Sequence, residues 1–483
     1  MSENRQTFQK SSVIAKVMTD LSTVDFKKII QRRDPKYDGR FYFGVKTTKI
    51  YCRPVCPAKP KPENIVIFKS CTEAENQGFR PCLRCHPDTM PGIKWQGGTI
   101  QSVARALHLM ETSLDWDQSL PQLANRLGLS DRHLRRLFDE HLGASPIEIL
   151  TTKRLHLARQ LVKDTQKSFS EIAFAVGFQS VRRFNEAFKT RYRSTPSEHR
   201  KKGIHRSTAD QLTIHLPVRA PLDWTSLLAY LKRHEVYGIE SISEKQYTRF
   251  LSQSSFFTAT FNQKQHCLEI NLSGVQLRDL RKVLGKIQIL FDLNHTPSHL
   301  PGKYSADGIR APGCFDPFET AISIVLSQLI STEAAKNKLK QLILEFGQCS
   351  GNVHGMDIYH FPTPDVLASA SIEKIGTTKV RANAIRELSK LISEKRIDLS
   401  QHTSFQETRT QLTNIKGIGP WTAEMISMRC LGDSDAFPRN DLVIAKALAS
   451  KQFSEQDWIS QRSYLTHLIW RNTTNFKETA NDL

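Results

Sequence analysis

Four cysteines lie in two close pairs near the start of the chain, and their spacing could bind a metal ion. Cys52 and Cys56 belong to "IYCRPVC", and Cys82 and Cys85 belong to "GFRPCLRC". Two close pairs separated by a loop can supply four thiolates to a tetrahedral zinc site, since each pair provides one edge of the tetrahedron. The sequence therefore predicts one Zn²⁺ held by these residues. The ion could serve only to hold the fold, or it could also activate a cysteine as a nucleophile.

A second candidate site lies near the other end, where "LTNIKGIGPWTAEMI" is followed by "DAFPRNDLVI". Gly417 and Gly419 predict the turn of a helix-hairpin-helix, in which the backbone approaches a DNA phosphate and the next helix N-terminus receives its charge. Asp441 is expected at the start of the following helix, facing this hairpin. Its carboxylate could stabilise a developing positive charge, or it could simply cap the helix.

Length and charge limit what these sites can act on. The chain has 483 residues, which suggests three or four domains, and its 68 Lys+Arg against 48 Asp+Glu give a formal net charge of +20. Such an excess favours nucleic acid as the partner, with a membrane surface or a solvated basic face as alternatives. No run of about 18 apolar residues appears, and the start "MSENRQTFQK" lacks the apolar region of a signal peptide. We therefore expect a cytoplasmic protein that does not bind membranes, in which the cysteines are not disulfide-bonded.

The fold that must position these sites is predicted to be multidomain α+β. Two breaks in composition, "HPDTMPGIKWQGG" and "HRKKGIHRSTADQ", divide the chain. Alternating apolar residues in "FFTATF" and "HCLEINL" predict strands, whereas the periodicity is helical from about residue 300 onward. We predict four parts: a small zinc-binding α/β domain (1–92), an all-α domain (93–205), a further α/β domain (206–300) and an all-α domain (301–483).

The all-α part at 93–205 contains a degenerate repeat with two helix-turn-helix units, whose turns fall at Gly128 and Gly177. The predicted core of the first unit is Leu123, Ala124, Leu127, Leu129, Leu134 and Leu137. The positions left for DNA are Arg132, His133, Arg135 and Arg136 in the first unit, and Arg182, Arg183 and Asn185 in the second. Two helical hairpins with solvated basic faces are the alternative. The pair, ending in "STPSEHR", resembles the AraC/XylS family of regulators, whose two motifs dock in successive major grooves.

Residues 1 to about 92 closely resemble the N-terminal domain of the Ada family of methylation sensors, through "DGRFYFGVKTTKIYCRPVC" and "GFRPCLRC". The resemblance implies that Cys52 accepts a methyl group from a DNA methyl phosphotriester. It also implies that Thr48, Lys59 and Arg80 contact the DNA backbone. Lys59 stands where the family has Arg, which keeps the charge but loses the bidentate geometry.

Residues from about 212 to the end resemble the AlkA family of DNA glycosylases, through "APLDWTSLLAYL", "GCFDPFETAISIVLSQLIS" and "RSYLTHLIW". The resemblance implies that Asp441 is the catalytic aspartate and that Leu329 is inserted into the duplex. The implied aromatic base pocket is Trp421, Trp470 and Tyr230, with Met425 where the family has tyrosine. Core packing is the alternative role for each aromatic residue. Trp421 stands at the position after the hairpin turn where bifunctional relatives have a Schiff-base lysine, so we expect a monofunctional enzyme that leaves an abasic site.

Together the resemblances imply a bacterial, nucleoid-associated DNA-alkylation response protein, which we expect to be monomeric. It would accept a methyl group, activate transcription of repair genes with RNA polymerase, and excise alkylated bases such as 3-methyladenine. The Ada family ordinarily ends in a methyltransferase domain with a Pro-Cys-His-Arg motif, which this sequence lacks. The alternative is a transcriptional regulator whose glycosylase-like half recognises damage without catalysis.

Overall fold

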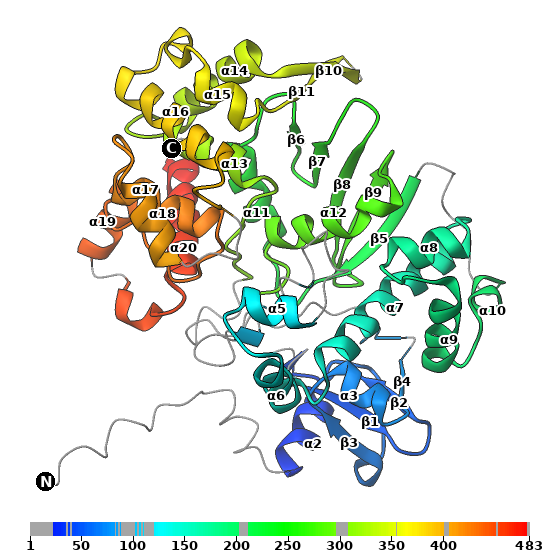
Figure 1. Ribbon diagram of the computed structural model, residues 1–483. Coiled ribbons are helices and arrows are strands. Elements are labelled where there is room, and N and C mark those ends of the chain that lie inside the picture. The colour runs from blue at the N-terminus through cyan, green and yellow to red at the C-terminus, as the bar shows by residue number, and fades with distance from the viewer. Residues whose placement is uncertain are drawn as a thin grey trace, which may run out of the picture. The chain divides into compact units, whose positions relative to one another are not determined.

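The computed structural model describes residues 23–87, 102–110, 120–201, 211–295, 308–399, 405–450 and 453–480, except positions 35–36, 39–40, 83, 86, 104–105, 108–109 and 354 (Figure 1). Its contacts divide the chain into two compact units. The first contains residues up to Met110 together with Asp115–Leu157 and Arg182–Thr195. The second contains Ala158–Val181 and Pro196–Leu483, with a short piece at 111–114. Among the described helices, none is both long and apolar enough to cross a membrane.

A four-stranded sheet of order β3-β1-β2-β4 forms the cysteine-bearing part of the first unit. Strands β1, β2 and β3 pair antiparallel, whereas β4 is parallel to β2. Phe43, Tyr51 and Phe68 are completely or almost completely buried in this sheet, and they anchor its short strands. The elements are α2 (Thr23–Arg32), β1 (Tyr42–Val45), β2 (Ile50–Cys52), η2 (Pro62–Asn64), β3 (Ile65–Phe68), α3 (Cys71–Asn76) and β4 (Arg80–Pro81).

Helices follow in the order expected for two helix-turn-helix units. Gly128 (φ +67°) and Gly177 (φ +92°) lie in the two predicted turns, where the left-handed backbone favours glycine. In the first helix-turn-helix unit, four residues of the predicted core are buried, namely Leu123, Ala124, Leu134 and Leu137. Leu127 and Leu129 are partly buried and pack against them. The helices are α5 (Leu120–Arg126), α6 (Asp131–Leu142), α7 (Pro146–Asp164), α8 (Phe169–Ala175), α9 (Val181–Tyr192) and α10 (Pro196–Lys201).

The second unit contains an antiparallel five-stranded sheet of order β5-β9-β8-β7-β6, as the alternating sequence pattern predicts (Figure 1). Trp224 of the first helix beside it contacts Phe261 and Phe291, and Phe291 also contacts Tyr247 of the sheet. These aromatic contacts attach the two flanking helices to the sheet. The elements are β5 (Gln211–Pro217), α11 (Trp224–Arg233), β6 (Glu240–Ile242), β7 (Gln246–Phe250), β8 (Phe256–Asn262), β9 (Cys267–Ser273) and α12 (Leu277–Leu290).

The rest of the second unit is mainly helical around a large apolar core, which includes Ile322, Leu342, Ile385 and Ile426. Caps define many of the helix starts, and Asp316, Ser331 and Thr378 each accept a backbone N–H in the first turn. The helices are α13 (Pro317–Leu326), α14 (Thr332–Phe346), α15 (Pro364–Ser369), η6 (Ile372–Ile375), α16 (Lys379–Ser393), α17 (Phe405–Thr413), α18 (Pro420–Arg429), α19 (Leu442–Ala449), η7 (Glu455–Trp458) and α20 (Arg462–Ala480).

One element of this region differs from the expected all-α composition. Strands β10 (Gln348–Val353) and β11 (Met356–His360) form an antiparallel hairpin between α14 and α15. Gly351 and Gly355 both have positive φ, and the Asn352 side chain accepts the Gly355 N–H at 2.9 Å. Glycine and asparagine favour such a turn over a continued helix. The hairpin is therefore a local insertion in an otherwise helical region.

Candidate metal centre and C-terminal cavity

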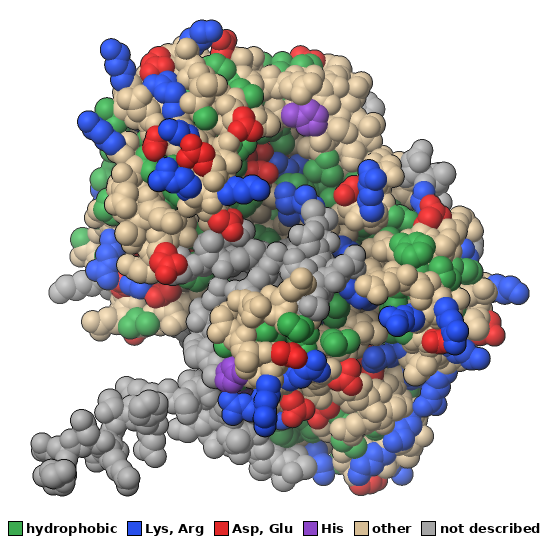
Figure 2. All heavy atoms as spheres, in the orientation of Figure 1, with side chains coloured by type: hydrophobic (Ala, Val, Ile, Leu, Met, Phe, Trp, Pro, Cys, Tyr) green, Lys and Arg blue, Asp and Glu red, His purple; other side chains and the backbone are tan. Residues whose placement is uncertain are grey.

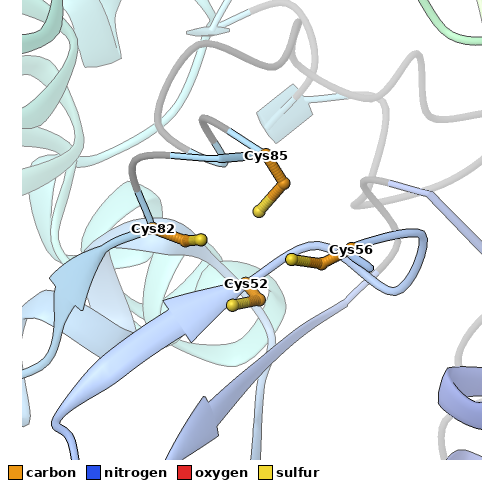
Figure 3. A group of neighbouring side chains, drawn as sticks. All are labelled: Cys52, Cys56, Cys82 and Cys85. Atoms are coloured by element: carbon orange, nitrogen blue, oxygen red, sulfur yellow. The ribbon is translucent and has the colours of Figure 1, made fainter. Parts of the chain in front are cut away.

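The four predicted cysteine ligands come together in the first unit, and their side chains point toward one another (Figure 3). One ligand atom from each of Cys52, Cys56, Cys82 and Cys85 lies within 4.8 Å of the others. Cys52 ends β2 and Cys82 directly follows β4, so two neighbouring parallel strands deliver one cysteine of each pair. A zinc–sulfur bond of about 2.3 Å places the sulfurs of a tetrahedral site roughly 3.8 Å apart. The cluster therefore has the size and the donor set that zinc requires.

The surroundings of the sulfur atoms also fit a cation. The backbone N–H groups of Arg53 and Arg84 point at the sulfurs of Cys85 (3.5 Å) and Cys82 (3.4 Å). Hydrogen bonding to the three neighbouring cysteines, followed by burial, raises the pKa of the Cys52 thiol well above its usual value. Four closely packed sulfurs can all be thiolates only with a cation among them. The four sulfurs and their surroundings therefore fit a bound Zn²⁺.

A buried ion pair that the sequence analysis missed supports the cluster. Arg53, next to the first ligand, donates from Nε to Asp38 Oδ1 at 2.8 Å and from Nη1 to the backbone oxygen of Cys85 at 3.3 Å. Both charged side chains are about nine-tenths buried or more. Arg53 thus connects the segments that carry the two cysteine pairs. In the sequence, only the position of Arg53 directly after Cys52 could have indicated that it supports the metal site.

Glu75 of α3 forms a second buried polar cluster in the first unit. Its side chain is 1 % exposed and accepts from Tyr51 Oη at 2.9 Å and Thr152 Oγ1 at 3.2 Å. It also contacts His156 Nε2 at 3.4 Å and forms an ion pair with Arg191. These partners belong to β2, α7 and α9, and Tyr51 directly precedes the first ligand. Glu75 therefore connects the metal-binding sheet to two helices of the helix-turn-helix region.

The residues expected to contact DNA from the metal-binding part are accessible to different degrees. Thr48, in the turn between β1 and β2, and Lys59 are exposed, whereas Arg80 at the start of β4 is half-buried. Cys52 itself is 2 % exposed, less than Cys82 (8 %) or Cys85 (9 %). Exposure therefore does not single out Cys52 as the methyl acceptor, and its assignment remains a prediction from the resemblance.

The predicted DNA-contacting residues of the two helix-turn-helix units lie on α6 and α9. Most of them are exposed, and His133 is half-buried. Arg135 pairs with Asp131 and Arg182 with Glu186, each across one helical turn, and Arg136 hydrogen-bonds to the His133 ring. Exposed pairs of this kind are weak and can be exchanged for phosphate contacts. This arrangement suits either DNA binding or a solvated basic face.

The predicted base-pocket residues of the second unit line a cavity of about 420 Å³. Its wall includes Tyr230 of α11, Trp421 and Met425 of α18, Trp470 of α20 and Asp441 at the start of α19, so four helix segments contribute. Tyr230 and Trp470 lie nearly parallel, with ring centroids 6.1 Å apart. The volume and the aromatic lining fit a flat ring such as a nucleobase.

Asp441 caps a helix and also lines the cavity. It is the N-cap of α19, and its Oδ1 accepts the backbone N–H groups of Val443 (3.0 Å) and Ile444 (3.2 Å). The same oxygen accepts the indole N–H of Trp470 at 3.3 Å. No hydrogen bond or ion pair to Oδ2 is found among the described residues. The cap thus fixes one oxygen, while the carboxylate still lines the cavity.

Buried charges that the sequence analysis did not identify form the inner wall of the cavity. Arg429 donates to Tyr230 Oη at 2.6 Å, and Arg249 forms an ion pair with Glu319 at 2.7 Å. Burial raises the pKa of Glu319 to about 7, although Arg249 opposes the shift. Burial and the nearby Arg429 lower the pKa of His234 to about 3. The partners are 70 to 199 residues apart in the sequence, so no local pattern could reveal them.

The predicted hairpin lies between α17 and α18, and its two glycines have different roles. Gly417 has φ +99°, and a Cβ there would meet Ala384 and Val380 of α16 at 3.1 Å. Gly419 is the N-cap of α18, where no side chain caps the helix and a Cβ would meet nothing within 4 Å. Gly417 is therefore required by backbone and packing, whereas Gly419 leaves open space at a helix N-terminus, where a phosphate could bind.

Leu329, the residue expected to enter the duplex, lies in the turn between α13 and α14. It is fully exposed (102 %) and has φ +55°, a conformation that non-glycine residues rarely adopt. A leucine held in this way makes no contact that would stabilise the folded chain.

Lys and Arg side chains are interspersed with Asp and Glu on the visible face of the molecule (Figure 2).

Comparison with known proteins assigns three segments to families. Residues 25–88 match the metal-binding domain of Ada, residues 123–202 a helix-turn-helix domain, and residues 213–316 the AlkA N-terminal domain. These matches confirm the resemblances inferred from the sequence.

Individual relatives cover different parts of the chain. The probable bifunctional transcriptional activator/DNA repair enzyme AlkA of Mycobacterium tuberculosis is 31 % identical over 92 % of this chain and 95 % of its own length. DNA-3-methyladenine glycosylase 2 of Escherichia coli is 27 % identical over 52 % of this chain and 94 % of its own. The Ada protein of the same organism is 37 % identical over 24 % of this chain and 31 % of its own. The chain therefore belongs to the family of bifunctional transcriptional activator/DNA repair enzymes that join an Ada-type metal-binding domain and a helix-turn-helix domain to an AlkA-type glycosylase.

Proposed function

We propose that the chain senses DNA alkylation with its zinc-bound cysteines, activates transcription, and excises alkylated bases with its C-terminal half. The domain limits that we propose are 1–92, 93–205, 206–300 and 301–483. The single observation that carries the repair function is a cavity lined by Trp421, Trp470 and the carboxylate of Asp441. We further propose that the protein is a monomer that recruits RNA polymerase at promoters.

In the sensing reaction, the thiolate of Cys52 attacks the methyl carbon of a methyl phosphotriester. A sulfur–carbon bond forms, the carbon–oxygen bond breaks, and the phosphodiester leaves as an anion. Zinc, when bound, keeps the sulfur deprotonated and nucleophilic at neutral pH. Methylation converts one thiolate to a neutral thioether and so removes a negative charge facing DNA phosphates. DNA binding then becomes stronger, and a single repair event becomes a transcriptional signal.

In the excision reaction, a methylated purine already carries positive charge and is a good leaving group. The protein must extrude the base, hold it between aromatic faces, and stabilise the sugar cation that develops. Trp421 and Trp470 line the space for the base, and Asp441 supplies the negative charge. Water adds to the sugar C1′, the N-glycosidic bond breaks, and the water proton is released. With Trp421 in the position where a Schiff-base lysine would stand, we propose a monofunctional glycosylase that leaves an abasic site.

One observation favours an alternative function. Asp441 caps α19 with Oδ1, so its presence could be explained without catalysis. The protein would then be a regulator whose second unit binds damaged DNA but does not release bases.

The test is to incubate the purified protein with methylated DNA, and to measure free bases by chromatography and the methylated cysteine by mass spectrometry. We expect released 3-methyladenine and one methyl group on Cys52. Cys52→Ser should abolish methyl uptake and leave base release unchanged. Methyl transfer without base release would favour the regulator, and a methyl group on Cys56, Cys82 or Cys85 would contradict the assignment of the acceptor.

A further inference from the structure

The turn that carries Leu329 is held from one side by its neighbour Gln328. Gln328 Nε2 donates to the backbone oxygen of Gly417 at 2.9 Å and to Thr422 Oγ1 at 2.8 Å. Gly417 belongs to the hairpin, and Thr422 lies in the first turn of α18. The amide nitrogen of Gln328 therefore connects the Leu329 turn to the hairpin turn and to the helix that follows it, 89 and 94 residues away in sequence.

A second contact fixes the backbone of the same turn. Arg381 of α16 donates to the backbone oxygen of Gln328, and it also donates to Thr377 Oγ1 at 3.2 Å. The turn itself is short, because α13 ends at Leu326 and Ser331 caps the start of α14. Gln328 is thus held through its main chain and its side chain, while the next residue is left exposed.

The geometry of the turn places it between the two parts of the excision site. Ser327 and Ile330 line the cavity, whereas Gln328 contacts the hairpin. The left-handed backbone at Leu329 costs energy, which the surrounding contacts must offset. A flexible turn would not present Leu329 at a fixed place relative to the cavity and to a phosphate bound at the hairpin.

We propose that Gln328 is a positioning residue for base extrusion. Its amide holds the Leu329 turn on the hairpin, so that Leu329 enters the duplex at a fixed distance from the point where the hairpin holds the DNA backbone. This inference rests on the proposed glycosylase function and on the assignment of Leu329 as the inserted residue. Gln328 acts through Leu329 and does not touch the base.

The substitution Gln328→Glu tests this role, because a carboxylate cannot donate a hydrogen bond and would face the Gly417 oxygen. Gln328→Met, which has a similar length and no donor, serves as a second variant. The matched control is Gln276→Glu, which makes the same charge change at an exposed N-cap position without a side-chain cap bond. Melting temperatures check that the variants fold.

Two DNA substrates separate positioning from a general loss of structure. One is a duplex with 7-methylguanine paired to cytosine, and the other has the same lesion in a single-nucleotide bulge, where no pair must be broken. We expect Gln328→Glu to slow single-turnover base release from the paired duplex by about tenfold to a hundredfold, the scale of a small misplacement. Release from the bulge should fall less than about threefold on the same scale, and Gln276→Glu should match the wild type on both substrates.

A combination with Leu329→Ala gives the sharpest test. Leu329→Ala alone should slow release from the paired duplex, and adding Gln328→Glu should cause no further loss. If the wild type is active, two results would overturn the positioning role. One is an equal loss of base release on both substrates, and the other is additive losses in the double variant. A wild-type protein that releases no base from either substrate would instead refute the proposed function itself.

Discussion

The metal centre and the C-terminal cavity both bury ionisable groups, but they balance the charge in different ways. The four cysteines supply only sulfur, and an external cation must neutralise them. In the cavity, the chain supplies both signs, since Arg249 pairs with Glu319 and Arg429 donates to Tyr230. The first site therefore depends on an ion for its structure, whereas the second is complete when the chain has folded. The two functions should fail under different conditions.

Removal of the metal should give the largest difference between the two sites. We expect a strong chelator, or the double substitution Cys82→Ser with Cys85→Ser, to abolish zinc binding and methyl uptake completely. A structural zinc site contributes on the order of 10 kcal/mol to the folding of its domain. Base release by the second unit should remain close to that of the wild type. Elemental analysis with both assays checks this, and zinc retained by the double variant would contradict the four-cysteine site.

Asp441→Asn should give the largest loss in the cavity. If the carboxylate stabilises the sugar cation, base release should fall by roughly a hundredfold or more, as for one preorganised electrostatic group. Asparagine caps a helix about as well as aspartate, so the melting temperature should hardly change. Binding to damaged DNA should also persist, because phosphate contacts come from other groups.

Single-turnover excision and DNA binding measured on the same Asp441→Asn preparation provide the check. Near-normal excision by the folded variant would show that Asp441 is only a cap. In that case, the second unit would bind damage without using this carboxylate for chemistry.

Tyr230→Phe should have a smaller effect, and mainly on stability. The change removes the hydroxyl that accepts from Arg429 at 2.6 Å, although Arg429 keeps weaker contacts to the Gly313 oxygen. Leaving a buried donor without this acceptor costs about 1–3 kcal/mol. Thermal unfolding should show this loss, while the ring still lines the cavity and excision falls only a few-fold. A variant as stable as the wild type would show that the pair contributes little.

The most gradual expected effect is a pH dependence of stability that comes from Glu319. Its pKa is raised from 4.5 to about 7, so the folded protein holds a proton that the unfolded chain releases. Stability should therefore fall as pH rises from about 4.5 to 7, by at most about 1.4 kcal/mol per pH unit. Above about pH 7 this contribution should be constant.

Thermal unfolding of wild type and Glu319→Gln at several pH values isolates this effect. The stability of the wild type relative to the variant should decrease across the window and then level off. A difference that does not depend on pH would mean that Arg249 keeps Glu319 ionised throughout.

The sequence by itself determined the features that depend on close spacing. The two cysteine pairs predicted the metal centre, because strand ends bring such pairs together within a short segment. Gly128 and Gly177 marked the helix-turn-helix turns, since few other residues adopt a left-handed backbone. The helix start at Asp441 was likewise predicted, because a cap is a local interaction.

Only the tertiary structure decided which distant groups meet. Arg429 and Tyr230 are 199 residues apart, and the Gln328 contacts to the hairpin span about 90 residues, so no periodicity relates these partners. The different roles of Gly417 and Gly419 also required the fold, since one packs against α16 and the other faces open space. The physical reason is that spacing along the chain encodes local geometry, whereas the partners of a buried polar group depend on how whole elements pack.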